Sequence, residues 1–131
     1  MKTSSTIRII FGASAVYDGI LGIIGLLFPY FLFTTFDVTP PNHPGYVQFP
    51  GALLIVFALM FTAIALNPRA NRNLIPYGIL LKLSYAGVVF YYWLGPGLPN
   101  MWKPFALADT VFMLLFVWAY MKLTTNTSKA A

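Results

Sequence analysis

The sequence predicts an all-α, polytopic membrane protein built as an antiparallel bundle of four transmembrane helices. Two observations carry this prediction. Of the 131 residues, 59% are hydrophobic and only 8% are charged, whereas a soluble domain carries about 25% charged residues. The apolar residues also gather into four long stretches, and a helix needs about 20 mostly apolar residues to cross a bilayer.

The four apolar stretches cover about residues 7–33, 50–66, 74–94 and 104–123. Backbone groups in lipid must be hydrogen-bonded within their own segment, so each stretch is predicted to be helical. Pro50 and Pro104 stand at the starts of the second and fourth stretches. The first turn of a helix tolerates proline because an N–H there has no partner within the helix. We therefore expect one integral membrane domain over residues 1–131.

Three polar segments separate the stretches. Residues 37–45 and 95–100 are rich in proline and glycine, and proline at such density is incompatible with a continuous helix. Residues 67–73 carry Arg69 and Arg72. Short loops join neighbouring helices that run in opposite directions, which predicts the antiparallel bundle.

The basic residues predict how the bundle is oriented in the membrane. Six of them fall near the chain ends or in segment 67–73, namely Lys2, Arg8, Arg69, Arg72, Lys122 and Lys129. Lys103 falls on the other side. Cytoplasmic loops carry an excess of Lys and Arg, so both termini are predicted to be cytoplasmic. The net charge is +5, but the basic residues are scattered singly at the ends of the apolar stretches. Membrane topology explains this pattern better than a nucleic-acid partner does.

Several chemistries lack the residues that they need. The chain has no cysteine and a single histidine, His43. Thiolate chemistry is therefore excluded, and no metal site is expected because a metal needs several converging ligands. Motifs of hydrolases, nucleotide-binding loops and zinc proteases do not occur. The sequence consequently leaves catalytic residues and cofactors unknown.

Three ionisable residues inside the apolar stretches give the clearest indication of function. They are Asp18, Lys82 and Asp109. A charge in hydrocarbon is costly and usually faces a bundle interior, where it finds a partner. At the rise of a helix, Asp18 and Lys82 lie about 16 Å and about 12 Å from the inner edge, so we expect them to pair. Asp109 lies only about 8 Å from the outer edge, and we expect a separate, shallower site there.

Polar neighbours on the same helices extend the predicted cluster. Residues three or four positions apart share one face of a helix. The predicted ligand-binding or buried polar residues are Asp18, Lys82, Asp109, Tyr17, Tyr85, Ser14 and Gln48. A structural role is the alternative, because a buried ion pair can fix the register of helices without binding any ligand.

The overall plan resembles the DoxX-like group of small four-helix membrane proteins. The likeness rests on Arg8-Ile-Ile-Phe-Gly12 at the start of the first stretch, on the glycines in its second half and on the basic segment after the second stretch. The resemblance implies a four-helix membrane fold. It also implies either an accessory subunit or a role in quinone-linked redox chemistry.

The expected function is that of a non-enzymatic accessory or lipophilic-ligand-binding component. A small membrane enzyme or redox subunit acting on a quinone- or isoprenoid-like substrate is the alternative, with Asp18 or Asp109 as acid or base. Transport by an oligomer is a further alternative, since four helices are few for a pathway within one chain. The expected partners are the lipid bilayer, a lipophilic small molecule, and either further copies of the chain or a larger membrane complex.

Overall fold

The described part of the chain is all-helical and contains no strand. The computed structural model describes the backbone of residues 2–130 and the side chains of residues 3–124. The helices are α1 (Lys2–Leu27), α2 (Phe31–Thr35), α3 (Gly45–Leu66), α4 (Ile75–Leu94) and α5 (Lys103–Ala130), with short 3-10 helices η1 (Arg72–Leu74) and η2 (Asn100–Trp102). Four of them, α1, α3, α4 and α5, are long and apolar enough to cross a membrane. The side chains of Lys2 and Lys129, used above to predict orientation, lie outside the described residues.

The first predicted span, residues 7–33, is wrong at its C-terminal end. Helix α1 ends at Leu27, and the short helix α2 follows after a break around Pro29. The ring of a proline disfavours helical backbone at the residue before it, which explains why α1 ends ahead of Phe28. The break redirects the chain, and Phe33 of α2 then packs edge-on against Trp102 of η2, with ring centroids 6.4 Å apart.

The start of the second predicted span, residues 50–66, is also wrong. Helix α3 begins at Gly45, so Pro50 lies inside the helix and not in its first turn. Proline at this position removes the N–H that would reach the carbonyl of Tyr46, and the helix continues at the cost of that bond. Pro104, in contrast, is the second residue of α5, in the first turn as predicted.

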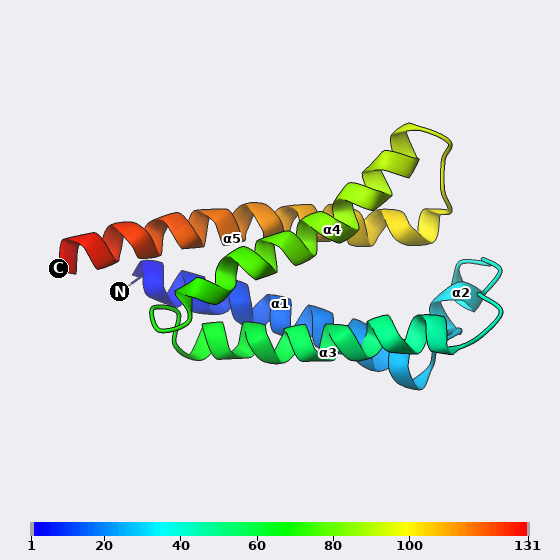
Figure 1. The fold of residues 1–131 in the computed structure, drawn as a ribbon, viewed down its shortest axis with the longest axis horizontal. Coiled ribbons are helices and arrows are strands. Elements are labelled where there is room, and N and C mark those ends of the chain that lie inside the picture. Colours follow the sequence, from blue (N-terminus) through cyan, green and yellow to red (C-terminus); the bar gives the residue numbers. More distant parts are fainter. Residues whose placement is uncertain (1, 131) are drawn as a thin grey trace.

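The long helices form two pairs. Helix α1 packs along α3, and α4 packs along α5 (Figure 1). The α1–α3 contact is close because glycines face each other. A Cβ on Gly22 would come within 2.7 Å of the carbonyl oxygen of Gly51, and a Cβ on Gly51 within 2.9 Å of the carbonyl carbon of Gly25. Small residues at such contacts let helix backbones approach closely.

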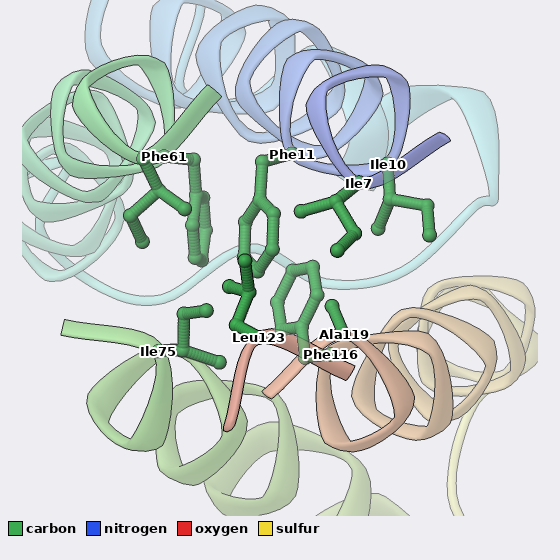
Figure 2. Packing of buried hydrophobic residues seen from close by; sticks show 9 residues of the cluster. Ile7, Ile10, Phe11, Phe61, Ile75, Phe116, Ala119 and Leu123 are labelled. Carbon is green, nitrogen blue, oxygen red and sulfur yellow. The ribbon is translucent and has the colours of Figure 1, made fainter. Parts of the chain in front are cut away.

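A hydrophobic core joins the two pairs (Figure 2). At its centre are Phe11 of α1, Phe61 of α3 and Phe116 of α5, which we call the aromatic cluster. The rings of Phe11 and Phe116 stack with centroids 4.5 Å apart, and the Phe61 ring lies 5.2 Å from that of Phe116. All three side chains are fully buried. The interior of the molecule is therefore closed at this level.

Both chain ends lie at one end of the molecule, together with the segment between α3 and α4 (Figure 1). We call this the terminal end, and the opposite end, with α2 and residues 95–99, the loop end. At the terminal end Arg8 donates a hydrogen bond of 2.7 Å to the carbonyl oxygen of Leu66, the last residue of α3. The guanidinium of Arg72 lies 3.7 Å from the ring centroid of Tyr120. These contacts hold the helix ends together, and the first satisfies a carbonyl that a helix leaves unbonded.

Candidate functional site

The three ionisable residues inside the long helices meet at one point. The Nζ atom of Lys82 lies 2.9 Å from Oδ1 and 3.0 Å from Oδ2 of Asp18, and 3.1 Å from Oδ1 of Asp109. Asp18 and Lys82 are each 1% exposed, and Asp109 is 8% exposed. We call Asp18, Lys82 and Asp109 the ion triad. It links α1, α4 and α5, which makes a buried connection between the two helix pairs.

The predicted pairing of Asp18 with Lys82 is confirmed, but the prediction of a separate site at Asp109 is wrong. That prediction treated the helices as parallel rods and compared depths along them. Helix α4 instead crosses the molecule obliquely (Figure 1). The long methylene stem of a lysine also carries its ammonium well away from its backbone. Both effects allow Lys82 to reach a carboxylate on α5 as well as one on α1.

The buried face of α4 positions Lys82. Gly78, Lys82, Ala86 and Val89 are buried and recur at spacings of three or four residues, so they lie on one side of the helix. A Cβ on Gly78 would come within 2.7 Å of the ring of Phe61. The glycine therefore lets α4 approach the aromatic cluster one turn before Lys82, which places the ammonium inside the molecule.

A cavity of about 770 Å³ lies beside the ion triad. Its mainly apolar walls come from all four long helices, from α2 and from the loop after α2. All three triad residues line it, and aromatic side chains contribute widely: Tyr17, Phe28, Phe33, Tyr46, Phe57, Tyr85, Trp102 and Phe105. Val38 and Pro41 also line it, so the cavity extends from the triad toward the loop end. The arrangement is an apolar, partly open cavity with charged groups on one wall.

The two predicted tyrosines line this cavity but differ in their bonding. The hydroxyl of Tyr85 donates to the carbonyl oxygen of Trp102 at 2.9 Å. The buried hydroxyl of Tyr17 has no hydrogen-bond partner among the described residues, and neither has that of Ser14. Buried polar groups are almost always bonded, so such exceptions need an explanation. The Tyr17 side chain lines the cavity, but its hydroxyl oxygen is itself buried.

The remaining two predicted site residues do not line the cavity. Ser14 is fully buried on α1, one turn before Asp18. The side-chain nitrogen of Gln48 donates to the carbonyl oxygen of Leu26 at 3.4 Å. This bond joins the start of α3 to the end of α1. The structure therefore does not bring Gln48 to the ion triad.

Sequence reasoning missed the part of the cavity that the loop end supplies. Phe28 and Phe33 fell within the first predicted span, and Val38 fell within a predicted loop. Pro29 was the available signal, because a proline inside an apolar stretch indicates a break. A break there would have turned the following aromatic residues back toward the bundle.

The described residues contain no group of three or more His, Cys, Asp or Glu side chains that could hold a metal ion. His43 is exposed in the loop before α3, and its Nδ1 accepts a hydrogen bond of 2.9 Å from the backbone N–H of Gly45. The polar chemistry of the site therefore rests on the ion triad and the tyrosines.

Comparisons with protein-family models, with curated proteins and with solved structures find no match for the chain. The resemblance to DoxX-like proteins accordingly stays a prediction. The function has to be argued from the geometry and chemistry of the cavity.

Proposed function

We propose that the chain is an integral membrane protein that holds a lipophilic small molecule in the cavity beside the ion triad. The cavity itself carries the proposal: about 770 Å³ of mainly apolar space bordered by two carboxylates and one ammonium. Binding sites for small molecules are typically concave and apolar, with a few polar groups that orient the ligand. The volume lies within the usual range for such sites.

The outer surface supports a place in the bilayer. Large apolar side chains such as Ile9, Leu66 and Leu94 are 70%, 71% and 85% exposed. Soluble proteins rarely expose extensive apolar surface, whereas in a membrane such side chains face lipid. In this proposal the four long helices cross the membrane as an antiparallel bundle. The terminal end faces the cytoplasm, because the basic residues gather there.

Binding fits the site better than catalysis or transport. A general base works best when its pKa lies near the operating pH, but both carboxylates of the triad accept from the Lys82 ammonium, and a carboxylate paired with an opposite charge is a weaker base. A transport pathway needs access from both sides. The aromatic cluster closes the interior between the triad and the terminal end. We therefore favour an accessory, ligand-holding component, working alone, as an oligomer or in a larger membrane complex.

A cavity-filling substitution tests the proposal. Leu54 lines the cavity from α3, whereas Leu59 on the same helix is 66% exposed and does not line it. Leu54→Trp should therefore fill ligand space, while Leu59→Trp places the same side chain against lipid. Native mass spectrometry of protein extracted gently from its own membrane should show a lipophilic adduct on the unaltered protein and on Leu59→Trp. The adduct should be lost from Leu54→Trp.

A second readout keeps the test decisive if the tryptophan unfolds the bundle. The thermal midpoint of Leu54→Trp in detergent should stay within a few degrees of the Leu59→Trp value, because the added ring enters existing space. A bare unaltered protein, or an adduct that persists in a folded Leu54→Trp protein, would overturn the proposal.

A further inference from the structure

We infer that the molecule held in this cavity is a lipophilic cation, an apolar body with a protonated amine at its polar end. The inference rests on the proposed binding function and adds the charge of the ligand to it. Three observations carry it: the enclosure of the Lys82 ammonium, the excess of carboxylates, and the aromatic lining beside them.

The first observation concerns access to the Lys82 ammonium. Lys82 is only 1% exposed, and its Nζ atom contacts the carboxylates of Asp18 and Asp109 at 2.9–3.1 Å. The rings of Phe112, Tyr17 and Phe61 also surround Nζ, with centroids 5.2, 5.3 and 5.6 Å away. A ligand carbonyl or carboxylate could reach this ammonium only by displacing one of these groups. Charge-assisted bonds are about twice as strong as neutral hydrogen bonds, so the triad discriminates against ligands whose polar end only accepts.

The second observation concerns charge. Two carboxylates face a single ammonium, so the triad carries one negative charge in excess when both carboxylates are ionised. Lys82 is the only cation among the described residues that line the cavity. Arg8 and Arg72 bond at the terminal end, on the far side of the aromatic cluster. An unbalanced charge in a low-dielectric interior is costly, and a cationic ligand in the cavity would balance it.

The third observation locates the ligand's polar end. Asp109 is the more accessible carboxylate of the triad, with a side chain 12% exposed against 2% for Asp18. Among the described residues no hydrogen bond reaches its second oxygen. The rings of Tyr17 and Phe105, with centroids 6.5 Å apart, line the same cavity. An ammonium there could donate to Asp109 and lie against aromatic rings, which attract cations.

Matched amphiphiles test the inference. The protein is reconstituted in nanodiscs of neutral phosphatidylcholine at pH 7, and binding of radiolabelled dodecylamine is measured against empty nanodiscs. We expect saturable binding to the protein. Unlabelled dodecanol and dodecanoate share the chain but lack the cationic end, and we expect each to compete at least tenfold less well than dodecylamine.

Charge variants assign the effect to Asp109. Asp109→Asn removes the excess charge while its amide oxygen can still accept from Lys82, and it should weaken dodecylamine binding at least tenfold. Asp109→Glu should restore most of it. Asp37→Asn is the matched control, because Asp37 is exposed, does not line the cavity and has a φ of 54° that asparagine also adopts readily. This variant should bind as the unaltered protein does.

The outcomes separate the inference from the function on which it rests. Competition by dodecanol or dodecanoate as strong as that by dodecylamine would overturn the cationic ligand but leave a lipophilic binding site. Unchanged dodecylamine binding in folded Asp109→Asn would also overturn it. No saturable binding of any of the three, together with a bare protein in native mass spectrometry, would overturn both.

Discussion

Lys82 is the residue on which the interior of the bundle depends most. It is the one cation that separates two buried carboxylates on different helices. Removing one partner from a buried charge cluster is far more damaging than exchanging the whole cluster for neutral groups, because the remaining charges stay buried without compensation. The ion triad therefore acts as a unit, and its residues should not contribute additively to stability.

We predict that Lys82→Met lowers the free energy of unfolding by about 3–5 kcal/mol, the range measured for broken buried ion pairs. Methionine has nearly the same length, so the loss would come mainly from the two uncompensated carboxylates. The free energy of unfolding in mixed micelles measures the effect. In the background Asp18→Asn with Asp109→Asn, the same Lys82→Met change should cost much less. Equal losses in both backgrounds would show that the triad is not coupled.

At the same scale, part of the site could be predicted from the sequence. Asp18 and Lys82 stand out because charge is rare in apolar stretches, and their similar depth predicted their contact. The contact of Lys82 with Asp109 could not be predicted, because it depends on the oblique course of α4 and on a flexible side chain. Gln48 was expected in the cluster, but it bonds to the carbonyl of Leu26 instead. Its position depends on how α3 packs against α1, which the sequence does not reveal.

Among the elements, the contact between α1 and α3 has the most stringent steric requirement. At Gly22 an added Cβ would lie 2.7 Å from a backbone oxygen and 2.8 Å from a side-chain carbon of Ile55. At Gly12, on the same helix, it would meet nothing within 4 Å. The two glycines thus form a matched pair, one at a helix contact and one in open space.

We predict opposite effects for alanine at these two positions. Gly12→Ala should leave stability unchanged or raise it by up to about 1 kcal/mol, because alanine favours helix over glycine. Gly22→Ala should lower the free energy of unfolding by about 1–3 kcal/mol, as overpacking does. Unfolding in mixed micelles measures both. A loss at Gly12 as large as that at Gly22 would contradict the close α1–α3 contact.

The helix boundaries show what apolar content can and cannot predict. The third predicted span, 74–94, nearly coincides with α4, because polar residues precede it and glycine follows it. The first span was drawn through Pro29, since its apolar residues continue on both sides of the break. The start of α3 was misplaced because Gly45-Tyr-Val-Gln-Phe49 is helical ahead of Pro50. Hydropathy locates the lipid-compatible segments, whereas local backbone geometry decides where each helix begins and ends.

For the whole molecule, the asymmetry of the two ends links fold and function. The terminal end combines the chain ends, the bonded arginines and the aromatic cluster that closes the interior. The loop end contributes α2 and η2 to the cavity walls. A ligand would therefore reach the triad from the bilayer or from the loop end. If the terminal end is cytoplasmic, access from the loop end lies on the outer side of the membrane.

Cysteine labelling tests this orientation, and the chain offers a clean background because it contains no cysteine. Asn42 is exposed in the loop before α3, and Ala70 is exposed between α3 and α4. Because positive loops stay cytoplasmic, a membrane-impermeant maleimide should label Asn42→Cys on intact cells and leave Ala70→Cys unlabelled. In inside-out vesicles the pattern should reverse, which controls for the reactivity of each site. Labelling of Ala70→Cys on intact cells would place the terminal end outside, and ligand access would then lie on the cytoplasmic side.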